Sequence, residues 1–298
     1  MTSSAAGQPE TRVLFVSGFH RSGTTLAATA VTAATGGTTL TVGHLADRIP
    51  SVAAFLAATR DAPADRGVDR VTVTAATPEE YGWLLYQAAG RRALSERDVR
   101  GGILRELVAA IGGAGPVVLK NPWDTGREDR LLRSVDNSSV LLVRRNLAAI
   151  EASLRRALLR YVGSNAYLRA LRSDDRGVRM TLRTLANPIG SRAILFVSRW
   201  VLRCKVVRLA GRVGGLPADR VAFVSYDELT DDPAAGAAWA AHLLPAANLA
   251  AAFGTWVFVD AGAPRPGGWL VRALDARWAR AWERARAAQV AAGVLPPP

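Results

Sequence analysis

The chain has 298 residues, 49% of them hydrophobic, which suits one large α/β domain or two small ones. Its formal net charge is +13, but the arginines are scattered and are not interleaved with aromatic residues, so we expect no nucleic-acid partner. A positive field of this size would instead concentrate a small ligand that carries several negative charges.

The chain also lacks the marks of a secreted or membrane-spanning protein. A single cysteine, Cys204, excludes an internal disulfide, and the first residues contain no apolar signal-peptide core, so we expect a cytoplasmic protein. A membrane-spanning helix needs roughly 20 predominantly apolar residues. The best candidate, 193–207, is interrupted by Arg199, Arg203 and Lys205, and we therefore expect no membrane span.

A strand, a tight loop and a helix follow one another near the start of the chain. Residues 13–16 (VLFV) form a β-branched apolar run that is typical of a buried parallel strand. Residues 18–25 (GFHRSGTT) contain glycines where the backbone must bend, and an Ala/Thr-rich helix is expected from residue 24. The unpaired N–H groups of such a loop and the helix dipole converge on one point, so the segment predicts an anion site.

The loop residues narrow the choice of anion. Gly18 and Gly23 have the spacing of the nucleotide triphosphatase loop G-x-x-x-x-G-K-[ST], whose lysine reaches the terminal phosphates. Thr24 stands where that lysine belongs, and the only nearby cation is Arg21 inside the loop. At this point a degenerate ATP loop and a loop for a different anion are both open.

Beyond the loop, the chain alternates between helical and strand-like segments. The first helix is expected to end at Gly36-Gly37, and 38–44 is expected to be a β-like segment that ends in Gly43-His44. Further helices are expected at about 49–59, 98–111, 127–134, 147–161 and 191–212, and a packing helix with Trp278 and Trp282 on one stripe is expected after residue 274.

A helix with an aromatic face is expected at about 78–90. Thr77 is the predicted N-cap, Pro78 fits the first helical position, and Glu80 completes a capping box. This helix would carry Trp83 and Tyr86.

Three more buried strands are predicted at 115–120, 139–143 and 220–226, separated by helical stretches. The fold class is therefore α/β, a single three-layer domain with a central parallel sheet flanked by helices. Ligands of such sheets bind at the carboxyl ends of the strands. The predicted ends carry Arg21, Lys120, Arg144, Arg145 and Tyr226.

The loop G-x-x-R-S-G-T-T resembles the 5′-phosphosulfate loop of sulfotransferases, enzymes that use 3′-phosphoadenosine 5′-phosphosulfate (PAPS). The likeness extends over roughly 13–274 and implies one sulfotransferase domain, which we place at 12–292 between flexible tails at 1–11 and 293–298. It also implies PAPS as the cofactor, 3′,5′-ADP as the product, and no metal.

Further motifs carry the same resemblance. Sulfotransferases place an arginine at a strand end and a serine two turns into the next helix to hold the 3′-phosphate, and Arg145 and Ser153 match this pattern. Residues 221–233 look like the family's Tyr-Glu-Asp-Leu strand end, whose tyrosine packs near the adenine, and 262–269 weakly matches the loop over the adenine. The implied cofactor site comprises Gly18, His20, Arg21, Ser22, Gly23, Thr24, Thr25, Arg145, Ser153, Tyr226 and Arg265.

Residues 119–123 (LKNPW) are similar to the Lys-Asp-Pro-Phe element of the tyrosylprotein sulfotransferase branch and its bacterial relatives, whose lysine reaches the bridging oxygen. Lys120 is therefore implied to be catalytic, together with Arg21. Cytosolic sulfotransferases carry Lys-Thr-His there and use the histidine as base, whereas Pro122 occupies its place in this chain.

The base is expected elsewhere. In the tyrosylprotein branch it is a glutamate after a glycine, shortly beyond the first helix, and the comparable position is Gly43-His44. His44 is our first choice, because imidazole titrates near neutrality and can take a proton from a hydroxyl. Glu79 and Glu80 are alternates, although helix capping explains both.

The resemblance implies in-line transfer of a sulfuryl group to a hydroxyl, or an amine, of a small aromatic or lipophilic acceptor. Trp83, Tyr86 and Trp123 are candidates for the acceptor pocket, with packing in the core as the alternative. A P-loop kinase or ATPase and a non-catalytic basic protein that binds nucleic acid are the competing functions. The sequence leaves the acceptor and the oligomeric state open.

Overall fold

A computed structural model describes residues 11–62, 64, 72–113, 115–161, 166–171, 180, 183–184, 187–244, 249–254 and 267–295. Within these residues, five parallel strands form one sheet in the order β2-β3-β1-β4-β5. The strands are β1 (Val13–Ser17), β2 (Thr38–Thr39), β3 (Val117–Lys120), β4 (Ser138–Arg144) and β5 (Val221–Ser225). The predicted α/β class with a central parallel sheet is confirmed.

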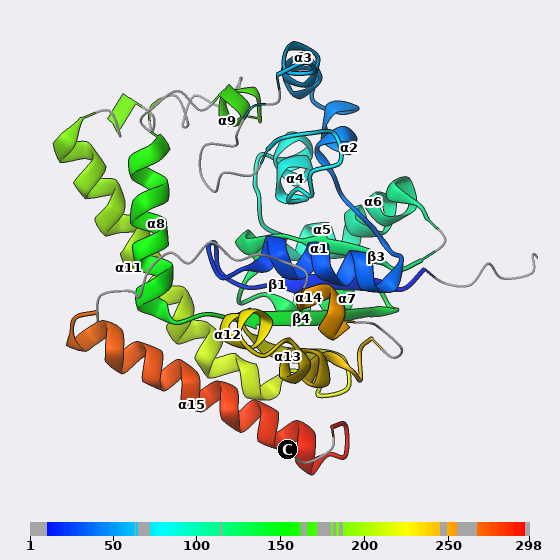
Figure 1. Cartoon of the computed structure of the whole chain (residues 1–298), viewed down its shortest axis with the longest axis vertical. Coiled ribbons are helices and arrows are strands. Elements are labelled where there is room, and N and C mark those ends of the chain that lie inside the picture. Colours follow the sequence, from blue (N-terminus) through cyan, green and yellow to red (C-terminus); the bar gives the residue numbers. More distant parts are fainter. Residues whose placement is uncertain are drawn as a thin grey trace, which may run out of the picture.

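Helices cover both faces of the sheet (Figure 1). On one face, alternate strand residues pack against α1 (Thr24–Thr35), α13 (Pro233–Ala240) and α14 (Leu249–Gly254). On the other face, the core includes side chains of α4 (Gly82–Ala89), α7 (Glu128–Ser134), α8 (Leu147–Tyr161), α11 (Pro188–Arg212) and α15 (Trp269–Ala291). The remaining helices are α2 (Val42–Ala46), α3 (Pro50–Ala58), α5 (Glu96–Gly101), α6 (Ile103–Ile111), α9 (Ala166–Leu171) and α12 (Tyr226–Thr230), with short 3-10 turns at Pro122–Asp124 and Val213–Gly215.

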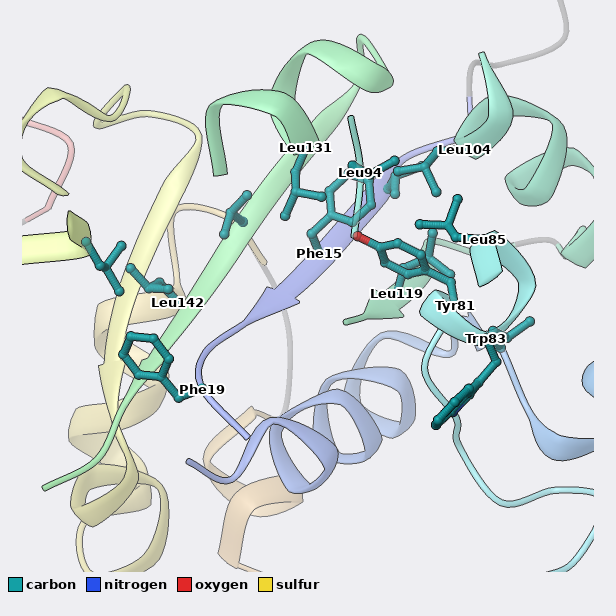
Figure 2. Close-up of a cluster of buried hydrophobic side chains, with 14 of the residues drawn as sticks. Phe15, Phe19, Tyr81, Trp83, Leu85, Leu94, Leu104, Leu119, Leu131 and Leu142 are labelled. Carbon is teal, nitrogen blue, oxygen red and sulfur yellow. The ribbon is translucent and has the colours of Figure 1, made fainter. Parts of the chain in front are cut away.

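The strands are apolar on both sides because the sheet is buried on both sides. In β1, Leu14 and Val16 face the layer that contains α1, and Val13 and Phe15 face the opposite layer. Figure 2 shows Phe15 in this second layer beside Tyr81, and the two rings meet edge-to-face with their centroids 6.5 Å apart. A continuous hydrophobic run is therefore what this strand position requires.

The helix start predicted at Thr77 is wrong. Helix α4 begins only after Tyr81, and the preceding residues lie extended along the sheet edge, where Glu80 forms a parallel bridge with Lys120. The Tyr81 N–H donates to the Lys120 carbonyl at 3.3 Å, while Thr77 Oγ1 accepts from the Thr74 N–H at 2.9 Å. Backbone partners from a distant strand thus outcompete a local capping pattern.

Two other predicted elements differ in extent. The β-like segment predicted at 38–44 is a strand for two residues only, and His44 lies in the first turn of α2, whose N-cap is Thr41. The single helix predicted at 98–111 is broken at Gly102, which has a positive φ of 71° and separates α5 from α6. The helices predicted at 24–35 and 147–161 are confirmed as α1 and α8.

The predicted packing helix near the end of the chain is confirmed as α15. Trp278 and Trp282 are completely buried on one stripe of this helix, and their rings meet edge-to-face at 6.3 Å.

No helix within the described ranges is long and apolar enough to cross a membrane. The domain limits at 12 and 292 stay a prediction, because most residues of the two tails lie outside those ranges.

We expect Trp282→Ala to destabilise the fold by about 3–5 kcal/mol, because it removes a buried indole and leaves a cavity against Phe223. Trp269→Ala is the matched control, since Trp269 lies on the same helix but is exposed. This variant should lose no more than about 0.5 kcal/mol of stability. Urea unfolding of both variants measures the difference. Similar losses at the two positions would contradict the packing role of α15.

Candidate active site

The loop between β1 and α1 makes a turn that only glycine permits at its first position. Gly18, Arg21 and Gly23 have positive φ values of 154°, 73° and 97°. A Cβ on Gly18 would lie 2.7 Å from the Val143 carbonyl oxygen and 2.6 Å from Ser22 Oγ. That Ser22 hydroxyl is completely buried and has no hydrogen-bond partner in the described part of the chain. Because an unpaired buried hydroxyl is costly, Ser22 is a candidate hydrogen-bond donor to a ligand held by the loop.

The N-terminus of α1 opens on the same loop. The first helical bond runs from the Ala27 N–H to the Gly23 carbonyl at 3.0 Å, so the helix itself does not use the N–H groups of Thr24 and Thr25. No acidic side chain lies in the first turn of this 12-residue helix. Its positive end is therefore suited to an anion.

Arg21, Arg145 and Ser153 meet around this loop; the strand ends predicted the two arginines, and the resemblance to sulfotransferases implied Ser153. Arg21 Nε donates a hydrogen bond to Ser153 Oγ at 2.9 Å. The Arg145 guanidinium donates to the Arg21 carbonyl oxygen at 3.0 Å, and burial lowers the pKa of Arg145. An anion beside these groups would offset the cost of burying positive charge there.

Tyr226 closes another side of the loop. Its ring lies against Gly23, where a Cβ would come within 2.5 Å of the ring, and the Arg145 guanidinium stacks on it at 4.0 Å. The adjacent Arg144 points elsewhere, toward Asp275 of α15 at 3.7 Å. Of two consecutive arginines, one therefore belongs to the loop region and the other ties α15 to the sheet.

Lys120 lies at the carboxyl end of β3 with only 1% of its surface exposed. The strand register pairs it with Val16, whose side chain faces the α1 layer, so Lys120 leaves the sheet on the side of the loop. Among the described residues its ammonium has no hydrogen-bond or ion-pair partner. A buried cation without a counterion is costly, and an anionic ligand would remove that cost.

Glu80 lies next to Lys120, and His20 lies next to Glu80. The bridge between Glu80 and Lys120 makes them direct neighbours on the sheet edge, and the His20 Nδ1 lies 3.9 Å from Glu80 Oε1. The His20 ring packs edge-to-face on Trp123 with centroids 4.7 Å apart. The loop, the end of β3 and the extended segment before α4 thus form one site.

The other two base candidates have structural contacts. Glu79 is buried, and its Oε2 accepts a hydrogen bond from the Tyr167 hydroxyl at 2.8 Å. His44 closes a capping box on α2, with its Nδ1 accepting from the Thr41 N–H at 3.1 Å. In an extended segment successive side chains point to opposite sides, which separates Glu79 from Glu80.

The predicted acceptor-pocket residues do lie together, around a cation that the sequence analysis missed. The Arg92 guanidinium is 4.9 Å from the ring centroid of Trp83 and 5.1 Å from those of Tyr86 and Trp123. The Asn121 amide, next to Lys120 in sequence, donates to the Arg92 carbonyl at 2.8 Å. No local signal marked Arg92, because it follows a helix end and its partners come from two other segments.

Two buried acids on the opposite side of the sheet support the site and were also missed. Asp124 accepts hydrogen bonds from the Tyr81 hydroxyl at 2.6 Å, the Asn121 amide at 2.7 Å and the Leu94 N–H at 2.7 Å. Burial is the main cause that raises the pKa of both Asp124 and Glu128.

Glu128 and its neighbours hold the end of β1. Its Oε1 accepts from the Ser17 hydroxyl at 2.8 Å and from the Gly126 N–H at 2.9 Å. Thr125 Oγ1 donates to the Gly18 carbonyl at 2.6 Å. The turn before α7 therefore fixes the point where the loop begins.

One predicted cofactor residue, Arg265, lies outside the described residues. No group of three His, Cys, Asp or Glu side chains that could hold a metal ion occurs in the described ranges.

No protein-family model matches the chain, and no curated protein matches it. Among solved structures, the chain is similar to the crystal structure of sulfotransferase STF1 from Mycobacterium tuberculosis H37Rv. The TM-score is 0.52 at 17% sequence identity, and the match covers 91% of this chain and 77% of that one. At this identity the likeness establishes the fold, so the expected sulfotransferase-like fold is confirmed.

We expect Glu128→Gln to stabilise the protein at neutral pH. Burial raises the pKa of Glu128 above 4.5, so the folded state disfavours the carboxylate, and this penalty grows as the pH rises through the folded pKa. The increase in the free energy of unfolding should shrink toward zero as the pH falls to about 4.5. Urea unfolding across this range measures it.

Glu96→Gln is the control, because Arg133 lowers the pKa of this exposed acid and its neutralisation should give no such gain. A gain in Glu128→Gln that is constant with pH would show that charge burial is not the cause.

Proposed function

We propose that this chain is a PAPS-dependent sulfotransferase that transfers a sulfuryl group to a hydroxyl, or an amine, of a small aromatic or lipophilic acceptor. One observation carries the proposal. The loop between β1 and α1 has the glycine spacing of a phosphate-binding loop but lacks its lysine, and Arg145, Ser153 and Tyr226 surround it near the buried Lys120. The likeness to a protein named as a sulfotransferase supports it.

The described residues fit the charge distribution of PAPS. The loop N–H groups, the Ser22 hydroxyl and the hydroxyls of Thr24 and Thr25 would hold the 5′-phosphosulfate at the N-terminus of α1. Arg145 and Ser153 would hold the 3′-phosphate, and Tyr226 would lie near the adenine. His20, Gly18, Gly23 and Arg265 complete the proposed cofactor site, in which no metal takes part.

The bound nucleotide would supply the sulfuryl group and depart as 3′,5′-ADP. Lys120 and Arg21 would neutralise the charge that develops on the oxygen between sulfur and phosphorus. A base must take the acceptor's proton as the new bond to sulfur forms. We favour Glu80 over His44 for this role, because Glu80 is the neighbour of Lys120 and the His44 Nδ1 is engaged in capping α2.

The acceptor would lie against Trp83, Tyr86 and Trp123, the aromatic wall built around Arg92. Trp123 joins this wall to the loop through His20. We propose a small-molecule acceptor, no nucleic-acid partner and a cytoplasmic location, as the sequence suggested.

Thermal unfolding with 3′,5′-ADP or with ATP and magnesium tests the function. The proposal expects 3′,5′-ADP alone to raise the melting temperature, because ligands that bind only the folded state stabilise it. A response to ATP with magnesium and none to 3′,5′-ADP would replace the proposal with a kinase or ATPase. The acceptor can then be sought by mass spectrometry of an extract incubated with PAPS, as a product that gains SO₃.

We expect Arg145→Ala to weaken binding of 3′,5′-ADP about tenfold or more, since a hydrogen bond to a charged group is worth about 1.5–3 kcal/mol. Binding of 5′-AMP, which lacks the 3′-phosphate, should change much less, and Ser153→Ala should show the same preference. Arg144→Ala is the control, because this arginine faces Asp275. Calorimetry that gives equal losses for both nucleotides would remove the assignment.

Lys120→Met should leave 3′,5′-ADP affinity nearly intact and lower turnover about 10²-fold or more, because the ammonium meets charge that develops in the transition state. Its melting temperature should not fall, since the change removes a buried cation without a described partner. A less stable variant that keeps its rate per folded molecule would end the catalytic role.

The base is decided by Glu80→Gln and His44→Ala. We expect Glu80→Gln to lower turnover by about 10²–10⁴-fold with little change in 3′,5′-ADP affinity. His44→Ala should cost roughly 1 kcal/mol of stability through its lost cap and keep its rate. The reverse pattern would restore His44 as the base.

A further inference from the structure

Helix α11 turns an apolar stripe toward solvent. Ile189, Phe196 and Trp200 are 78%, 71% and 58% exposed, and Val197 and Val201 lie beside them. Their spacing places them on one side of the helix, opposite Leu202, Val206 and Leu209, which pack in the core. From 189 to 201 the stripe is about 18 Å long at 1.5 Å per residue. A contiguous exposed apolar face of this kind indicates a partner.

The charge of α11 restricts what that partner is. The helix contains no Asp or Glu, and it carries cations on both flanks of the stripe. At 100° per residue, one flank holds Arg192, Arg199 and Arg203, and the other holds Arg208 and Arg212. Lys205 is instead partly buried, with its Nζ 6.0 Å from the ring centroid of Trp123. Glu151 of α8 pairs with Arg203 at 2.7 Å and with Arg199 at 3.4 Å. Arg192 and Arg208 are exposed and have no ion-pair partner among the described residues.

One flank of the stripe is hollowed. A cavity of about 350 Å³ is lined by Arg192, Leu195, Phe196, Arg199, Trp200 and Arg203. Guanidinium groups and aromatic rings therefore share one concave surface. This combination suits an anionic headgroup that is attached to an apolar chain, because the cations bind the charge and the rings cover the hydrocarbon.

Other occupants fit less well. Two copies of α11 packed stripe to stripe would bring arginine-lined flanks together with no acidic residue of either helix between them, which is unfavourable. A nucleic acid would use the cations and leave Ile189, Phe196 and Trp200 exposed to water. An interfacial helix, with bulky apolar residues on one face and arginines beside them, uses both features.

We infer that α11 docks on the surface of a membrane that contains anionic phospholipids. Phe196 and Trp200 enter the boundary between headgroups and acyl chains, and Arg192 and Arg208 contact phosphates at its level. The helix lies in the plane of the membrane and does not cross it, in accord with the charges that interrupt this run. The inference does not depend on the proposed reaction.

Co-sedimentation of the full chain with two kinds of vesicle tests it, one of phosphatidylcholine and one of phosphatidylcholine mixed with phosphatidylglycerol. We expect binding to the anionic vesicles, weaker at high salt, and little binding to the neutral ones. Phe196→Asp and Trp200→Asp should each weaken binding about tenfold or more with an unchanged melting temperature, because both side chains are exposed in the folded chain.

Arg192→Glu should weaken binding more than Arg105→Glu, an equal charge change on the exposed surface of α6, at the opposite side of the molecule (Figure 1). Equal effects of these two changes would show that the net positive charge of the whole chain causes the binding. That result would overturn the assignment to α11. Absence of binding to anionic vesicles would also overturn it. A dimer in light scattering that Trp200→Asp converts to a monomer would overturn it as well, since a second copy would then cover the stripe.

Discussion

The carboxyl edge of the sheet gathers positive charge around the loop between β1 and α1. Lys120 is buried without a counterion among the described residues, burial depresses the pKa of Arg145, and α1 directs its positive end at the same point. Each arrangement costs free energy in the absence of an anion, because desolvation disfavours cations. These buried cations lower the stability of the ligand-free fold, and binding of an anion would restore it. Such destabilising groups are typical of functional sites.

Side chains on the opposite face of the sheet hold the backbone of the site in place through hydrogen bonds. Glu128 and Thr125 fix the end of β1 through Ser17 and Gly18, and Asp124 fixes the segment after β3 through Asn121. These acids lie behind the sheet, so they support the loop without occupying it. The site is therefore positioned by hydrogen bonds from α7 and the turn before it, on the side of the sheet opposite α1.

Sequence reasoning succeeded where the signal was local. Gly18 and Gly23 located the loop, and Gly36 located the end of α1. The resemblance to sulfotransferases implied Arg145 and Ser153, and each of them contacts Arg21. It failed at Thr77, where a sound capping pattern lost to backbone bonds with β3. It also missed Arg92, whose aromatic partners come from separate segments, so that only the folded chain brings them together.

Helix α8 separates the candidate active site from the apolar stripe of α11. Glu151 binds the arginines of α11, and Ser153, two residues later, binds Arg21 of the loop. Two residues along a helix turn the side chain by about 200°, so these contacts lie on nearly opposite sides of α8. Because the two sets of cations are held by different faces of one helix, charge on the α11 surface can change while the hydrogen bonds of the loop stay in place. The proposed membrane-docking surface and the proposed anion site therefore use separate sets of residues in this chain.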